Sequence, residues 1–169
     1  ISLFRKAGIV RCFSREELTT VGCIFTLPRF TGKNFAIVTH ASGPGVMLTD
    51  ALSKGGMHVP PLTGKTADEL KSKLLPGSSV SNPIDILATG SAEHLAIAID
   101  YCEHNFEDID AIMVIFGTPG LVKLFEVYDI LHQKRQECHK PIFPILPSIT
   151  TAGAEVQEFL KRGHVNFSD

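Results

Sequence analysis

Cysteine is scarce in this sequence, and the few cysteines are not paired. The chain of 169 residues has four cysteines and seven histidines, without a C-x-x-C pair or a zinc-type spacing between the two residue types. Scattered cysteines of this kind are typical of reducing compartments. We therefore expect free thiols, no metal site and a cytoplasmic location. The cysteines are Cys12, Cys23, Cys102 and Cys138.

Long hydrophobic runs and an excess of charge of one sign are also missing. No apolar run approaches the roughly 18 residues of a membrane-spanning helix, and no signal peptide is recognisable. The chain has 16 Lys and Arg against 18 Asp and Glu, a formal net charge of −2, with the two signs interspersed. We expect neither a membrane nor a nucleic acid as partner. Because the sequence starts at Ile1 within a helical pattern, we also expect a piece of a larger protein.

The sequence does contain a regular alternation of apolar runs and helical patterns. Its 44% hydrophobic residues are sufficient for the core of one domain. Continuous apolar strands separated by single helices indicate a parallel sheet covered on both faces. The predicted fold class is α/β, a flavodoxin-like, doubly wound parallel sheet of five strands. These strands are predicted over 35–39, 57–60, 83–87, 111–116 and 142–146, with short strands also expected at 9–13 and from 165.

Helix ends carry capping signals. The segments Ser14–Glu17 and Thr66–Glu69 have the pattern of capping boxes and predict helices that begin there. Pro28 and Gly32 indicate a linker between a lead-in over 1–33 and a main domain over 34–169. Further helices are predicted over 44–53, 92–104, 121–135 and 152–162.

The segment from Phe35 to Asp50, FAIVTHASGPGVMLTD, is the strongest candidate for a binding site. A strand that ends in a glycine-rich turn before a helix places free backbone N–H groups, and the positive end of the helix dipole, at the carboxyl edge of the sheet. We predict a phosphate site there. In the alternative interpretation, the glycines only allow a tight turn to pack. The predicted phosphate-binding residues are Ser42, Gly43, Pro44, Gly45 and Val46.

Other polar or small residues are predicted at the same edge of the sheet and form a candidate pocket rim. A histidine there suits acid–base chemistry, although no carboxylate is near it in sequence to orient it. The asparagine and the aspartate at 82 and 85 stand at the entry of the strand predicted over 83–87, where an Asx-type turn is the favoured interpretation. The predicted rim residues are His40, Asn82, Asp85, Gly117, Thr118 and Ser148.

Three signatures of common α/β proteins are absent. The acidic residues of a response-regulator receiver are missing after the first strand, where Thr39, His40 and Ala41 stand. No strand-end loop carries the aromatic residues that a flavin site needs. The first loop also lacks the lysine of a nucleoside-triphosphate P-loop. From the residues alone, the chain is an anion-binding α/β domain without a self-contained active site.

Five segments in a fixed order resemble a known family. They are FRKAGIVRCFSREEL, GKNFAIVTHASGPGVMLTDAL, LLPGSSVSNPIDILA, DIDAIMVIFGTPG and KPIFPIL. Together they are similar to the ligase-CoA domain of NDP-forming acyl-CoA synthetases, which resemble succinyl-CoA synthetases. The resemblance extends from about Phe4 to Phe167. The first loop of the family reads T-N-A-G-G-P-G-V, so this chain differs at His40 and Ser42.

The resemblance implies a role within a larger enzyme. Such enzymes convert acyl-CoA, ADP and phosphate to the free acid, CoA and ATP through an acyl phosphate and a phosphohistidine. It implies that 42–46 hold the phosphate or phosphohistidine, and that no residue of this segment is catalytic by itself. CoA, ATP or ADP, and Mg²⁺ would bind the intact enzyme rather than this segment. The implied partners are a CoA-binding domain, a flavodoxin-like domain and an ATP-grasp domain or subunit.

Two alternatives of other classes remain at this stage. Protein lysine acetyltransferases contain a ligase-like regulatory region of the same kind, and a plain interaction domain could retain the fold without the site. The retained Gly43-Pro44-Gly45 favours a working phosphate site over the interaction domain.

Overall fold

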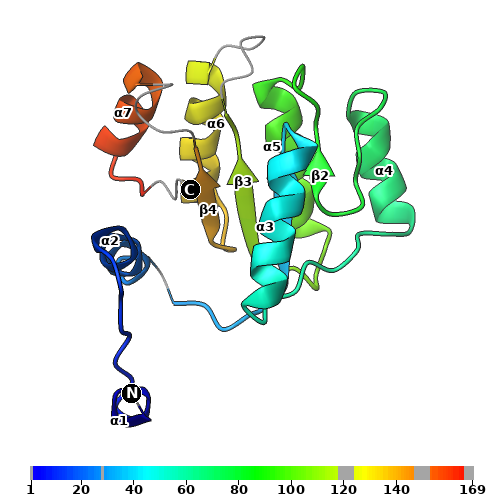
Figure 1. Cartoon of the computed structure of the whole chain (residues 1–169). Coiled ribbons are helices and arrows are strands. Elements are labelled where there is room, and N and C mark those ends of the chain that lie inside the picture. Colours follow the sequence, from blue (N-terminus) through cyan, green and yellow to red (C-terminus); the bar gives the residue numbers. More distant parts are fainter. Residues whose placement is uncertain (1, 28, 118–123, 147–152, 166–169) are drawn as a thin grey trace.

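The protein is a parallel sheet with helices on both faces, together with two N-terminal helices (Figure 1). The computed structural model describes residues 2–27, 29–117, 124–146 and 153–165. The elements are α1 Ser2–Lys6, α2 Arg15–Ile24, β1 Phe35–Thr39, α3 Ser42–Lys54, α4 Lys65–Lys73, β2 Ile84–Asp85, α5 Ala92–His104, β3 Ala111–Ile115, α6 Leu124–Glu137, β4 Ile142–Ile145 and α7 Gly153–Lys161.

The sheet has the strand order β2-β1-β3-β4, and every pair is parallel. Phe35 to Thr39 align with Ala111 to Ile115, while Thr39 lies beside Asp85 at the other edge of β1. Helix α3 covers one face and α5 and α6 cover the other (Figure 1). The α/β class and the helices on both faces are thus confirmed.

The prediction of five strands is not confirmed, because the described residues form four. Residues 57–60 contribute one isolated bridge, in which Phe35 N donates to His58 O and His58 N donates to Lys33 O, both at 2.8 Å. Pro60 and Pro61 follow and have no N–H to extend the ladder. The segment 9–13 is not a strand, Val165 is outside any strand, and 166–167 lie outside the described residues.

Alternation along the strands fills the core. Ala36 and Val38 of β1 belong to the main hydrophobic cluster together with Leu95 of α5 and Leu131 of α6. All five residues of β1 are buried, because the strand is paired on both edges and covered on both faces. This central strand fixes the position of the loop that follows it.

Of the two predicted capping boxes, the one at Ser14 is confirmed only in its serine half, because Glu17 accepts from the residue before the N-cap. At α2 the Ser14 hydroxyl accepts from Glu17 N at 3.0 Å, and the Glu17 carboxylate reaches back to Phe13 N at 2.5 Å. The capping box at Thr66 is wrong, because α4 begins at Lys65 with Gly64 as its N-cap. Gly64 has a φ of 82°, which glycine adopts without steric cost.

The linker before β1 is fixed to the amino edge of the sheet. The Phe30 ring packs edge-on against Phe35 and tilted against Phe143, with ring centroids 5.8 and 5.7 Å apart. Asp110, just before β3, accepts hydrogen bonds from Lys33 N and Asn34 N, each at 2.9 Å. The chain therefore enters the sheet along a defined path.

Candidate functional site: the amino end of helix α3

The turn between β1 and α3 is held by the last residue of the strand. The buried Thr39 hydroxyl accepts from Ala41 N at 3.0 Å and donates to Ala41 O at 2.8 Å. Ala41 is the N-cap of α3 and has extended backbone angles, without a side-chain cap on the helix. Because the alanine side chain has no acceptor, the N–H groups of the first turn receive no hydrogen bond from the side chain at the N-cap.

The first turn of α3 is only partly available to a ligand. Ser42, Gly43 and Pro44 are exposed, as is Val46, whereas Gly45 is buried. Pro44 has no N–H, so Ser42 and Gly43 carry the free donors of the first three helical residues. The helix begins at Ser42 rather than at Pro44 as predicted.

The two glycines of this turn have different roles. A Cβ on Gly45 would lie 3.2 Å from Thr39 Cγ2 and 3.3 Å from Pro83 Cβ, so Gly45 lets α3 pack closely on its neighbours. A Cβ on Gly43 would meet no atom within 4 Å. Packing therefore accounts for Gly45, and Gly43 is the glycine that leaves the helix end open.

A carboxylate lies at the start of the helix. Asp85 is 8% exposed, and its Oδ1 accepts from Leu87 N at 2.9 Å. Its Oδ2 accepts a short hydrogen bond from the Ser42 hydroxyl. A negative charge is favourable beside a helix N-terminus. The sequence predicts Ser42 at this edge of the sheet but Asp85 at the entry of its strand, so it does not predict their contact, which depends on the pairing of Thr39 with Asp85.

His40 joins the ends of β1 and β3. Its ring stacks on Phe116 with centroids 4.7 Å apart, and its Nδ1 lies 3.4 Å from both Ile115 O and Gly117 N. Burial lowers the pKa of His40, against the opposing effects of Ile115 O and Asp85. The imidazole is thus mainly neutral at pH 7 and is held by the fold.

Of the remaining predicted rim residues, two serve the packing and hydrogen bonding of the fold, and two lie outside the described ranges. Asn82 accepts from Ile37 N and donates to Phe35 O and Pro60 O, all at 2.9 Å, so its amide is used within the fold. Gly117 leaves room for the His40 ring, because a Cβ there would lie 3.3 Å from His40 Cε1. Thr118 and Ser148 lie outside the described residues.

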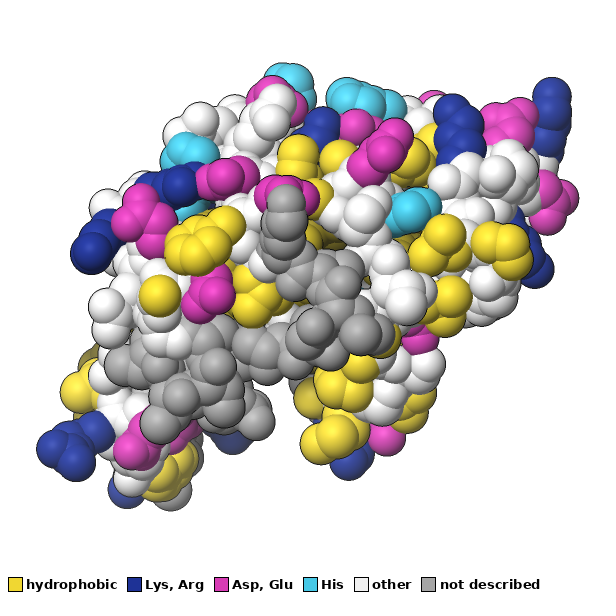
Figure 2. All heavy atoms as spheres, turned by 90° about the horizontal axis from the view of Figure 1, so that it is seen from above, with side chains coloured by type: hydrophobic (Ala, Val, Ile, Leu, Met, Phe, Trp, Pro, Cys, Tyr) yellow, Lys and Arg dark blue, Asp and Glu magenta, His cyan; other side chains and the backbone are white. Residues whose placement is uncertain are grey.

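The surface at this edge carries charges of both signs. Figure 2 views the molecule from the carboxyl edge of the sheet and shows basic and acidic side chains interspersed on that face. Within residues 2–27, 29–117, 124–146 and 153–165, no three His, Cys, Asp or Glu side chains are grouped so that they could hold a metal ion. In the same ranges, no helix has the length and hydrophobicity needed to cross a bilayer.

Comparisons with known proteins point to one family, although no family model matches the chain. The chain is 33% identical over 135 residues to acetate–CoA ligase [ADP-forming] I of Archaeoglobus fulgidus, covering 80% of this chain and 19% of that protein. It is 36% identical over 90 residues to the alpha subunit of acetate–CoA ligase [ADP-forming] II of Pyrococcus furiosus, covering 53% of this chain and 20% of that subunit.

Solved structures share the fold. A crystal structure of a Pyrococcus horikoshii OT3 protein matches 98% of this chain with a TM-score of 0.87 and 24% identity, over 39% of its own chain. The acetyl-coenzyme A synthetase 1 of Ca. Korarchaeum cryptofilum, solved in complex with phosphate and ADP, matches 96% with a TM-score of 0.81 and 21% identity, over 35% of its chain.

The structure is thus a parallel α/β domain with an open helix end at the carboxyl edge of its sheet. By its sequence relatives, the chain belongs to the family of ADP-forming acetate–CoA ligases, of which it matches one segment. It spans only 13–20% of the length of the curated relatives that it matches.

Proposed function

We propose that the chain is the segment of an ADP-forming acyl-CoA synthetase that presents the amino end of α3 to phosphate or phosphohistidine. The observation that carries the proposal is the exposed first turn of α3, with the N–H groups of Ser42 and Gly43 at the carboxyl edge of the sheet. The relationship to ADP-forming ligases supports it, as does the binding of phosphate and ADP by the Korarchaeum enzyme.

The residues present fit a phosphate with one opposing feature. Two backbone donors and the helix dipole attract an anion, while the Asp85 carboxylate, bonded to Ser42, repels it. A bound phosphate would accept hydrogen bonds from Ser42 N and Gly43 N beside that carboxylate. Asp85 therefore weakens phosphate binding at this end of α3 and favours loss of the anion after transfer.

The whole enzyme would convert acyl-CoA, ADP and phosphate to acid, CoA and ATP. In this proposal CoA, the nucleotide and Mg²⁺ bind the CoA-binding, flavodoxin-like and ATP-grasp partner domains, and this segment adds no catalytic side chain. Residues 1–33 form the lead-in from the preceding domain and 34–169 the ligase-CoA domain. This division is supported by α2, which has no buried residue. In the proposal, its apolar side chains are covered by the preceding domain. The relatives are ligases, so they do not favour the acetyltransferase alternative.

The proposal is tested by titrating the ¹⁵N-labelled chain with inorganic phosphate at constant ionic strength. We expect selective shifts of the Ser42 and Gly43 amide signals. Gly43→Asp adds a charge where a side chain meets no atom, so it should abolish the shifts, whereas Gly43→Asn should retain them.

Removing the opposing charge supplies the converse test. Asp85→Asn should bind phosphate several-fold more tightly, because it loses the repulsion. Its single amide oxygen can still accept from Leu87 N, and its amide nitrogen can donate to the Ser42 hydroxyl. Unchanged amide signals up to about 50 mM phosphate in both the native chain and Asp85→Asn would contradict a preformed site at this helix end.

A further inference from the structure

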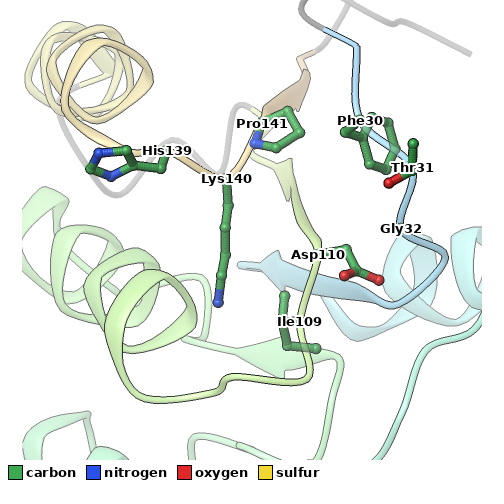
Figure 3. A pocket seen from close by; sticks show the side chains of 8 residues that line it. All are labelled: Phe30, Thr31, Gly32, Ile109, Asp110, His139, Lys140 and Pro141. Atoms are coloured by element: carbon green, nitrogen blue, oxygen red, sulfur yellow. The ribbon is translucent and has the colours of Figure 1, made fainter.

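A pocket lies at the amino edge of the sheet, opposite to the candidate phosphate site. It has a volume of about 370 Å³, within the range of small-molecule sites. The linker before β1 forms one wall, and the residues that lead into β3 and β4 form the others (Figure 3). Its lining residues are Phe30, Thr31, Gly32, Ile109, Asp110, His139, Lys140 and Pro141.

Part of the pocket wall is apolar. Phe30, Ile109 and Pro141 present hydrocarbon surface. Lys140 adds its alkyl stem, because its ammonium turns toward the end of α5 and donates to Cys102 O at 2.7 Å and Phe106 O at 2.9 Å (Figure 3). This cation is therefore already paired with backbone carbonyls.

The carboxylate of Asp110 is the negative charge that lines the pocket at the start of β3. Its Oδ2 accepts from Lys33 N and Asn34 N, which orients the group. Its Oδ1 has no hydrogen bond to any residue in the described ranges, so one oxygen is left to accept from a ligand. His139 does not neutralise it, since that ring is 95% exposed and pairs with Glu103 at 3.3 Å.

We propose that this pocket binds an organic cation, an alkylammonium or alkylguanidinium group. A preoriented carboxylate accepts a charge-assisted hydrogen bond from such a group, an aromatic ring attracts the cation, and the apolar walls take the alkyl chain. An anion would be repelled by Asp110. The cation comes either from a Lys or Arg side chain of a neighbouring domain or from a free amine. The site is independent of the phosphate site at α3.

The first experiment titrates the ¹⁵N-labelled chain with n-butylguanidinium and, separately, with butyrate. Because Lys33 N and Asn34 N bond to the proposed ligand group, we expect their amide signals to shift with the cation and not with the anion. Asp110→Asn retains an acceptor for both amides but has no charge, and it should lower the affinity by about tenfold or more. Asp108→Asn removes an exposed carboxylate two residues away and should leave the affinity unchanged.

The same titration on the full-length protein identifies the source of the cation. Shifts in the isolated chain that disappear in the full-length protein indicate a side chain already seated in the pocket. Shifts in both indicate a site for a free amine. Absence of shifts in the chain at tens of millimolar ligand, or equal binding by Asp110→Asn, would overturn the proposal.

Discussion

At Gly32 the chain has no room for a side chain. A Cβ there would lie 2.0 Å from Asp110 Cγ and 2.1 Å from its Cβ, within the core of that side chain. The close approach lets Asp110 accept from Lys33 N and Asn34 N. A glycine that the sequence places in a linker is thus a packing residue, and its partner is 78 positions away.

Replacing this glycine tests the contact. Gly32→Ala should displace Asp110 and lower the free energy of unfolding by about 1–3 kcal/mol, through steric overlap and two weakened hydrogen bonds. Gly43→Ala is the matched control, because a Cβ there meets no atom and alanine favours a helix. Urea denaturation of both variants measures the difference. Equal midpoints would show that Asp110 moves aside at no cost.

Single residues also show how far sequence reasoning reached at the candidate site. The strand-to-helix turn and its exposed residues Ser42 and Gly43 were predicted from local signals. The contact of Ser42 with Asp85 and the stacking of His40 on Phe116 were not, because each joins segments that are far apart in the sequence and are brought together by the strand pairing. Such contacts depend on strand order and register, which local patterns leave open.

At the level of elements, long apolar runs were predicted well and short ones poorly. Strands β1, β3 and β4 and helix α5 agree closely with their predictions, because apolar runs determine the strands and a capped start determines the helix. Strand β2 has two residues, since Asn82 supplies side-chain hydrogen bonds to Phe35 and Ile37 where a strand would supply backbone ones. The periodicity of a sequence does not reveal a side chain whose hydrogen bonds replace the backbone hydrogen bonds of a strand.

Helices α6 and α7 are linked through a histidine. Arg135 of α6 donates to His164 Nδ1, and His164 Nε2 faces His132 Nδ1 at 2.5 Å. The His164 ring also stacks on Phe159 of α7 with centroids 4.4 Å apart. This arrangement requires a neutral His164, because Nδ1 accepts from a guanidinium.

Acid should weaken this link. Burial, with the charges of Arg135, His132 and Arg162, lowers the pKa of His164 from 6.5 to about 4. A base whose pKa is lower in the folded state contributes its full stability above pH 6.5, and this stability is lost as the pH falls from 6.5 toward 4. Urea midpoints should therefore decrease across that range.

A non-titrating side chain isolates this effect. His164→Gln should flatten the change in midpoint between pH 6.5 and 4, while His58→Gln, at an exposed position, should leave it unchanged. A profile for His164→Gln that is as steep as that of the unaltered chain would assign the acid sensitivity to other groups.

For the whole molecule, the N-terminal segment carries most of the exposed large apolar side chains among the described residues. Figure 1 shows α1 and α2 apart from the sheet. Several large apolar side chains of this segment are exposed, including Phe13 at 76% and Phe25 at 75%. Exposed apolar patches of this kind mark surfaces for association.

Polar substitution of these two residues separates association from stability. Phe13→Ser with Phe25→Ser should reduce self-association of the isolated chain in light scattering, and should change its free energy of unfolding by less than about 0.5 kcal/mol. Phe30→Ser is the contrasting control, because Phe30 packs on Phe35 and Phe143 and its loss should destabilise the sheet. Unaltered light scattering by the double variant would contradict self-association through the N-terminal apolar surface.

The central place of β1 has a consequence for protein synthesis. The strand is made first, yet its partners Ile84 and Ala111 come about 46 and 76 residues later. At roughly 5–20 residues per second, the ribosome exposes the FAIVT segment for several seconds before either edge can be covered. During that interval this segment is the natural place for a chaperone to bind the nascent chain.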